Sequence, residues 1–120
     1  MEPKQIVDAI FSVDKNIRYV GVVGPGPDYD VKESCMRDGV RSLTSDEKDR
    51  EFIQFLPEII LGITEKLKDD MGKIKYSLLC FQKATLMLFK TPEYVVVMSI
   101  EAGTFAKPIY ERLRPLLELQ

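Results

Sequence analysis

The chain has 120 residues, of which 45% are hydrophobic and 30% charged, as expected of one globular domain spanning residues 1–120. Its 17 Lys and Arg residues nearly balance its 19 Asp and Glu residues, and the net charge is −2. With no obvious basic patch in the sequence either, nothing suggests nucleic-acid binding. Histidine is absent, which removes the commonest general base and the commonest metal ligand.

The cysteines and the N-terminus bear on the cellular compartment. Cys35 and Cys80 lie far apart without CxxC spacing, which favours two reduced thiols over a disulfide. The first residues, MEPKQIVDAIF, include acids and lack the apolar core of a signal peptide. No apolar run approaches the ~18 residues of a membrane span. We therefore expect a cytoplasmic protein that binds neither membranes nor nucleic acids.

The first third of the chain predicts a helix followed by a hairpin. Apolar residues at helical spacing after Pro3 indicate a short amphipathic helix that closes near Asn16. The β-branched segment IRYVGVV, residues 17–23, predicts a first strand. The prolines of GPGPDYD, residues 24–30, remove N–H groups that a phosphate-binding loop would need, which favours a wide hairpin turn. Residues 29–36 then predict a polar edge strand.

A long helix is predicted next. The T-x-x-E pattern from Thr44 to Glu47 is typical of a capping box, and Gly72 is a helix stop. Pro57 should interrupt and kink the helix because its ring clashes with the preceding turn. Six apolar residues form one stripe, which we expect to face the sheet: Phe52, Leu56, Ile59, Ile60, Ile63 and Leu67.

This apolar stripe is wider than one buried face requires. Ile53 and Phe55 lie on its opposite flanks and widen it to roughly 160°, against the ~100° that a single contact needs. Gly62 falls next to Phe55 on the same flank. The extra width has two explanations, a wedge between sheet and loops or a contact with a partner chain through Phe55 and Gly62.

Residues 73–100 predict a meander of three strands, over residues 73–81, 84–89 and 94–100. Strands this close in sequence pair antiparallel. Because the meander hardly alternates apolar and polar residues, we expect both of its faces to be covered, with Cys80 in the core. Residues 104–119 predict a final helix, which should share one side of the sheet with the first helix while the long helix takes the other.

The predicted order is α-β-β-α-β-β-β-α, an α+β fold with a five-stranded antiparallel sheet and helices on both faces. This order resembles the roadblock/dynein-light-chain-like domains of the profilin-like and longin-like group, and within them small archaeal members. The segments that carry the resemblance are IRYVGVV, the capped helix from Ser45, and KIKYSLLCFQKATLMLFKTPEYVVVMSIEAG. GPGPDYD departs from the family pattern, because it is longer and stiffer than the usual acidic-Gly turn.

The resemblance implies a non-enzymatic homodimeric module that partners a small Ras-like GTPase. Such domains dimerise through the long helix and an edge of the sheet, so the candidate interface residues are Ile53, Phe55, Ile59, Gly62 and Lys66. We expect no cofactor and no metal. An alternative is a profilin-like or PAS-like sensory domain that holds a small apolar ligand between sheet and helix.

An enzyme is the third hypothesis, and the sequence gives it little support. Asp69–Asp70 forms the nearest thing to a carboxylate pair, but adjacent positions do not share a helix face. Asp28 and Asp30 lack the further oxygen ligands of a calcium loop. Cys35 is the more plausible reactive thiol, yet no histidine can activate it. The absence of a convergent polar constellation favours an interaction module.

Overall fold

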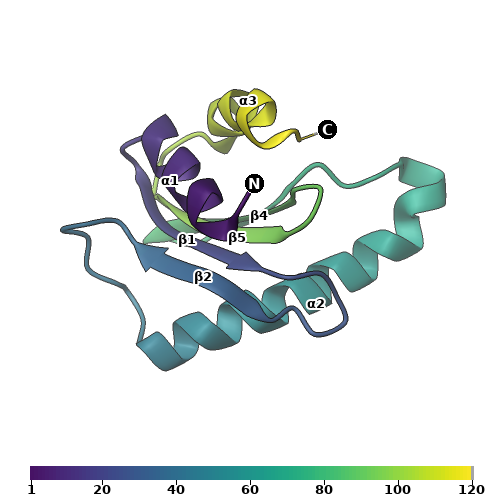
Figure 1. Ribbon diagram of the computed structural model, residues 1–120, viewed down its shortest axis with the longest axis horizontal. Helices are drawn as coiled ribbons and strands as arrows, with labels where there is room; N and C mark the ends of the chain where they lie inside the picture. The colour runs from purple at the N-terminus through teal and green to yellow at the C-terminus, as the bar shows by residue number, and fades with distance from the viewer. Residues whose placement is uncertain (120) are drawn as a thin grey trace.

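The computed structural model describes residues 1–119, except for the side chain of Asp46. Figure 1 shows a layered arrangement, with α1 and α3 on one side of a sheet and α2 on the other. The elements are α1 (Pro3–Val13), β1 (Ile17–Val23), β2 (Val31–Met36), α2 (Asp46–Met71), β3 (Ser77–Cys80), β4 (Ala84–Lys90), β5 (Val95–Glu101) and α3 (Ala106–Leu117). Among residues 1–119, no helix combines the length and apolarity needed to cross a membrane.

The five strands form one sheet in the order β2-β1-β5-β4-β3, and every neighbouring pair is antiparallel. β1 pairs with β5 at the centre, where Val22 lies opposite Val96. The hairpin predicted at GPGPDYD joins β1 to β2, and Gly24 N–H donates to the Asp30 carbonyl at 2.9 Å. The predicted α+β fold with helices on both faces is confirmed.

One face of the sheet packs against α1 and α3. Alternate residues of β1 and β5, such as Val22 and Met98, are fully buried there against Ile10 of α1 and Leu113 of α3. This packing follows from the period of two in a strand and the stripe spacing of an amphipathic helix. The predicted sharing of this face by the first and last helices is confirmed.

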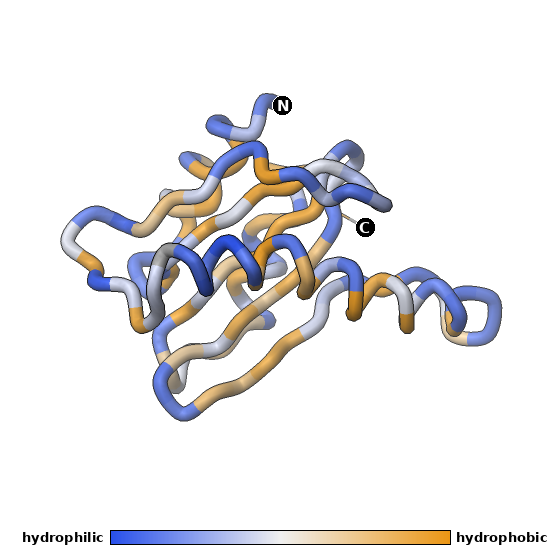
Figure 2. Tube along the Cα trace, turned by 90° about the horizontal axis from the view of Figure 1, so that it is seen from below, coloured by the Kyte–Doolittle hydropathy of each residue, from blue (hydrophilic) through white to orange (hydrophobic). Residues whose placement is uncertain are grey.

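The other face packs against α2 at close range. Ile53 and Leu56 of α2 meet Tyr19 and other buried side chains of β1 and β5. Gly21 of β1 makes this approach possible, since a Cβ atom there would lie 2.7 Å from Tyr19 Oη and 2.9 Å from Ile53 Cγ2. α2 makes its main sheet contacts with β1, β2 and β5, and Figure 2 shows the β3–β4 hairpin extending beyond its cover.

Three local predictions about α2 and β3 need correction. Ser45, not Thr44, caps α2, because its Oγ accepts a hydrogen bond from Lys48 N–H at 3.2 Å. Pro57 does not interrupt the helix, which continues through it and ends, as predicted, at Gly72, whose φ is +85°. β3 begins at Ser77 rather than at residue 73, so the meander is shorter on this side than predicted.

β3 is also less covered than predicted. It is an edge strand, with Leu78 39% exposed, and Phe81 just beyond it is 56% exposed. The expectation of two covered faces is therefore confirmed for the buried β5 but wrong for β3. Cys80, predicted in the core, is exposed, and both it and Cys35 are free thiols.

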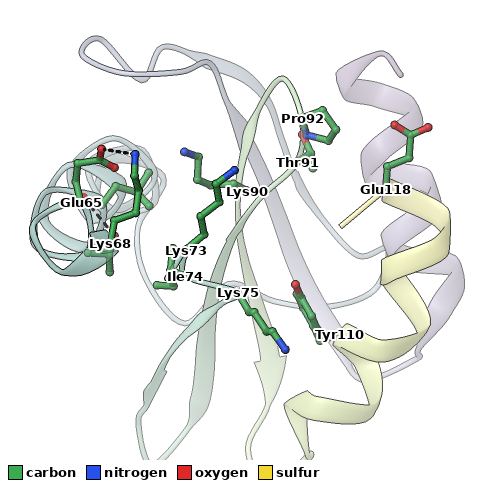
Figure 3. A pocket seen from close by; sticks show the side chains of 12 residues that line it. Glu65, Lys68, Lys73, Ile74, Lys75, Lys90, Thr91, Pro92, Tyr110 and Glu118 are labelled. Carbon is green, nitrogen blue, oxygen red and sulfur yellow. Dashed lines mark hydrogen bonds and ion pairs between the residues drawn. The ribbon is translucent and has the colours of Figure 1, made fainter. Parts of the chain in front are cut away.

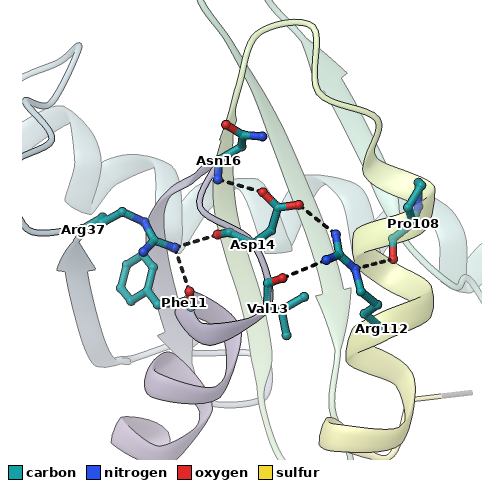
Figure 4. A network of polar contacts seen from close by, with 7 residues as sticks. All are labelled: Phe11, Val13, Asp14, Asn16, Arg37, Pro108 and Arg112. Atoms are coloured by element: carbon teal, nitrogen blue, oxygen red, sulfur yellow. Dashed lines mark hydrogen bonds and ion pairs between the residues drawn. The ribbon is translucent and has the colours of Figure 1, made fainter.

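Arg37 fastens the end of β2 to the C-terminus of α1 (Figure 4). Its guanidinium donates to the carbonyls of Phe11 at 2.8 Å, Asp14 at 2.7 Å and Ile17 at 2.7 Å, and lies 4.9 Å from the centroid of the Phe11 ring. The last carbonyls of a helix have no partner within the helix. Arg37 therefore satisfies groups that burial would otherwise leave unpaired.

Arg112 of α3 completes this network from the other side (Figure 4). It donates to the Val13 carbonyl at 2.9 Å and to Asp14 Oδ2 at 2.7 Å. Asp14 Oδ1 accepts from Asn16 N–H at 2.7 Å. That backbone hydrogen bond, followed by the hydrogen bond and charge of Arg112, lowers the pKa of Asp14 against the opposing effect of partial burial.

Candidate functional site

α2 carries a row of exposed apolar side chains along a flank that the sheet does not cover. These residues, which we call the α2 stripe, are spaced three or four apart and so lie along one side of the helix. Their exposed fractions run from 40% to 59%. The row comprises Phe52, Phe55, Ile59, Ile63 and Leu67. Large apolar residues contiguous on a surface are typical of an interaction site.

The predicted interface residues divide between two sides of α2. Phe55 and Ile59 belong to the α2 stripe, and Gly62 and Lys66 are exposed at its edge. A Cβ atom on Gly62 would meet nothing within 4 Å, so space is open above it. Ile53 is 1% exposed and packs against the sheet, so it does not lie on the outer face.

The predicted orientation of the helix is therefore wrong in one respect. Phe52, Ile59, Ile63 and Leu67 are exposed rather than packed against the sheet, and the apolar side chains that pack against it are Ile53, Leu56, Ile60 and Leu61. The close approach over Gly21 places Ile53 at the centre of the contact. The helix is rotated about its own axis so that half of its wide apolar arc is exposed to solvent.

An apolar cleft continues from the N-terminal half of the α2 stripe. It has a volume of about 530 Å³ and lies between α2 and the β3–β4 hairpin. Phe52 and Ile53 form one wall, and Phe81 and Leu86 contribute from the hairpin. The cleft exists because α2 covers mainly β1, β2 and β5, leaving this part of the sheet open (Figure 2).

Tyr19 contributes one of the polar groups that line this cleft. Burial raises the pKa of Tyr19 to about 12, although the hydrogen bond between its hydroxyl and Ser34 Oγ, at 2.8 Å, acts in the opposite direction. The phenol is therefore neutral at physiological pH. At the rim, Arg18 Nη1 pairs with Glu101 Oε1 at 2.8 Å. The cleft offers apolar contact rather than a reactive charge.

The other residues singled out in the sequence lie apart from this surface and from one another. The Cys35 thiol donates to the Met36 carbonyl at 3.3 Å on edge strand β2. Asp69–Asp70 is exposed near the end of α2. Asp30 pairs with Lys32 at 2.7 Å, and that hydrogen bond lowers the pKa of Asp30. No group of three or more Cys, Asp or Glu side chains that could hold a metal is found in the described part of the chain.

Sequence reasoning missed the contribution of the β3–β4 hairpin. Leu78 and Phe81 are exposed on this hairpin, and Phe81 lines the cleft beside Phe52. The signal was present in the doubly apolar run from residue 78 to residue 81. An apolar edge strand is a ready template for pairing with another chain. The exposed surface therefore extends from α2 to this edge of the sheet.

Comparison with known proteins gives the fold. No family model matches the chain, and no curated protein matches it in sequence. Among solved structures, MglB in a tetrameric arrangement is similar, with a TM-score of 0.66 and 10% identity over 96% of this chain and 89% of that one. MglC from Myxococcus xanthus has a TM-score of 0.55 and 14% identity over 95% and 94%.

A third similar structure is a roadblock/LC7 domain. The roadblock/LC7 domain from Streptomyces avermitilis has a TM-score of 0.52 and 11% identity over 92% of this chain and 95% of that one. At these identities the likeness concerns the fold alone. The chain has a roadblock-like fold, as the order of its elements predicted; the narrower likeness to archaeal members stays a prediction.

Proposed function

We propose that this protein is a non-enzymatic interaction module of roadblock type that forms a homodimer and acts as a partner of a small Ras-like GTPase in the cytoplasm. The observation that carries the homodimer is the α2 stripe together with the apolar edge at Leu78 and Phe81. A monomer that left both exposed would present large apolar side chains to water on two adjoining elements, at a cost of about 25 cal/mol for each Å².

The pattern along α2 suits a second copy in an antiparallel arrangement. With a two-fold axis between Glu58 and Ile59, Phe55 of one chain lies over Gly62 of the other, where a Cβ would meet nothing within 4 Å. The same register brings Glu51 near Lys66. A two-fold interface repeats each contact, so one complementary pair counts twice. The predicted residues Phe55, Ile59, Gly62 and Lys66 all lie within this contact, and Ile53 supports it from beneath.

Phe55→Glu tests the homodimer. A carboxylate in the centre of an apolar interface should weaken the dimer by roughly 100-fold or more, because the charge would lose water without gaining a partner. Sedimentation velocity should then find a dimer for the unaltered chain and a monomer for the variant. Phe55 is 57% exposed, so the fold should survive, as a circular dichroism spectrum would verify.

Phe105→Glu is the matched control. Phe105 is 82% exposed and is the N-cap residue of α3, a helix that lies on the opposite side of the sheet from α2 (Figure 1), so this variant should stay dimeric. A monodisperse monomer for the unaltered chain at high concentration would rule out the homodimer.

The GTPase partner is a separate part of the proposal. It rests on the roadblock-like fold, which the similar structures of MglB and of a roadblock/LC7 domain support. Isothermal titration of the dimer against Ras-like GTPases from the same genome, loaded with GDP or a GTP analogue, tests it. Micromolar binding to one of them supports the role, and absence of binding to all of them contradicts it while leaving the homodimer intact.

A sensory domain that holds a small apolar ligand is the second candidate, and the cleft favours it. Its volume of about 530 Å³ and its lining by Phe52, Phe81 and Leu86 fit a ligand of drug-like size. Native mass spectrometry of the purified protein discriminates between the two candidates. A retained ligand of low molecular mass supports the sensory role, whereas a dimer without one supports the interaction module.

A further inference from the structure

A second cleft lies on the flank of α2 opposite the α2 stripe. It has a volume of about 530 Å³ and lies between the C-terminal half of α2, residues 73–75, the β4–β5 turn and α3 (Figure 3). A cavity of this size is in the range that small molecules occupy. Its charged side chains are four lysines and two glutamates: Lys68, Lys73, Lys75, Lys90, Glu65 and Glu118.

Most of the positive charge in this cleft is not neutralised by a direct partner. Lys68 Nζ is 3.2 Å from Glu65 Oε1, which accounts for one lysine and one glutamate. Among the described side chains, no acid lies within 4.0 Å of the ammonium groups of Lys73, Lys75 or Lys90. Glu118 is the one other acid in the lining that the structure describes.

The local sequence explains this imbalance. Residues 71–92 contain four lysines and no Asp or Glu, although acids make up 19 of the 120 residues. Residues 73–76 precede the start of β3, and Lys90 ends β4, so three of these lysines, Lys73, Lys75 and Lys90, line this cleft, whereas Lys83 lines the cleft beside the β3–β4 hairpin. In Figure 3 the side chains of Lys73 and Lys90 extend into the space between α2 and the sheet. Like charges in one cleft repel each other until an anion enters.

We propose that this lysine cleft binds a phosphate-bearing ligand with several negative charges. Ammonium groups on flexible stems bind phosphate oxygens as point charges and adjust to groups of different size. Three such groups from two segments suit a polyanion better than a single carboxylate. Ile74 and Pro92 add apolar surface for an organic part of the ligand. The site is independent of dimerisation, because its α2 residues lie away from the α2 stripe.

Titration with pyrophosphate at low ionic strength tests the proposal. Isothermal titration of the full chain should give saturable binding at one site per chain, and Lys73→Gln/Lys90→Gln should weaken it at least tenfold. Amide resonances of Ile74 and Thr91 should shift on titration in the unaltered protein. Both lysines are exposed, so the double variant should keep the thermal midpoint of the unaltered chain.

The control separates a built site from general charge attraction. Lys15→Gln/Lys107→Gln removes the same charge from exposed positions outside the cleft and should change the affinity less than twofold. The proposal fails if pyrophosphate does not saturate, or if the control weakens binding as much as the cleft variant does.

A second arm of the experiment identifies the source of the phosphate. Phosphatidylcholine vesicles containing one fifth phosphatidic acid present the same group on a lipid. We expect the soluble probe to bind and the vesicles not to, because the lysines line a cleft rather than a flat face. Vesicle binding lost in Lys73→Gln/Lys90→Gln would keep the phosphate site and assign it to a lipid headgroup.

Discussion

Asp14 joins three segments through atoms of one residue. Its carboxylate accepts from Asn16 N–H and from Arg112, while its main-chain carbonyl accepts from Arg37. The end of α1 thus meets the end of β2 and also α3, whose Arg112 lies 98 residues from Asp14 along the chain (Figure 4). A hydrogen bond to an ionised group stabilises a fold by about 1.5–3 kcal/mol, more than a neutral one. The ionisation of Asp14 is therefore tied to the folded state.

This linkage between the ionisation of Asp14 and folding predicts that stability depends on pH. Because folding lowers the pKa of Asp14, its carboxylate stabilises the fold above the unfolded pKa of about 3.9, and this contribution is lost as the pH falls through the folded pKa. Asp14→Asn should lose on the order of 1 kcal/mol in the free energy of unfolding at pH 7. The difference between variant and unaltered chain should shrink below about pH 4, as urea unfolding from pH 7 to pH 3 would measure.

Asp8→Asn provides the comparison on the same helix, at an exposed position. Its effect at pH 7 should stay within about 0.5 kcal/mol. A loss in Asp14→Asn that stays constant down to pH 3 would mean that packing, and not ionisation, explains the role of Asp14.

At the scale of elements, the sequence predicted the order of helices and strands because each period is local. IRYVGVV became β1 with the predicted bounds, since its β-branched residues suit a strand whatever lies around it. The facing of α2 could not be predicted in the same way. Its apolar arc is wider than one contact needs. Whether Ile53 or Ile59 packs against the sheet depends on the space above Gly21, which lies 32 residues from Ile53 along the chain.

The same distinction explains what was predicted of the candidate site. Phe55 was predicted because it widens the apolar arc beyond what one buried face needs, and Gly62 because it falls next to Phe55; both are local properties of the helix. The edge position of β3 depends on the pairing of β1 with β5, which no local pattern specifies. Exposure of Leu78 and Phe81 therefore became apparent only in the folded chain.

A charge exchange tests the proposed antiparallel register of α2. Glu51→Lys should weaken the dimer by roughly tenfold, because two like-charged contacts with Lys66 replace two opposite ones. Adding Lys66→Glu should restore most of the lost affinity, since the pairs are then complementary again. Sedimentation equilibrium of both single variants and the double variant measures the coupling.

A parallel arrangement of the helices would separate these two positions. In that case the loss of dimer affinity in the double variant would equal the sum of the losses in the two single variants. The proposed register would then be wrong even if the dimer exists. Glu58→Lys with Lys66→Glu is a control, because residue 58 lies by the proposed axis, opposite Ile59 of the other chain, and so cannot replace Glu51 as the partner of residue 66.

At the scale of the whole molecule, the apolar cleft adjoins the α2 stripe through Phe52, whereas the lysine cleft lies on the other flank of α2. The α1 and α3 face is closed by a continuous core, whereas the α2 face leaves the stripe and the hairpin open. A chain of 120 residues buries a smaller share of its surface than a large protein does, so association adds appreciably to its stability. Folding and dimerisation should therefore be coupled.

This coupling predicts that thermal stability depends on protein concentration. A folded dimer that unfolds to monomers gains about 1.4 kcal/mol for each tenfold rise in concentration, which corresponds to several degrees in Tm for a domain of this size. Differential scanning calorimetry over a hundredfold range should find a rising Tm for the unaltered chain and a constant Tm for Phe55→Glu. A constant Tm for both would show that the α2 stripe adds nothing to folding, and a rising Tm for both would place the association elsewhere.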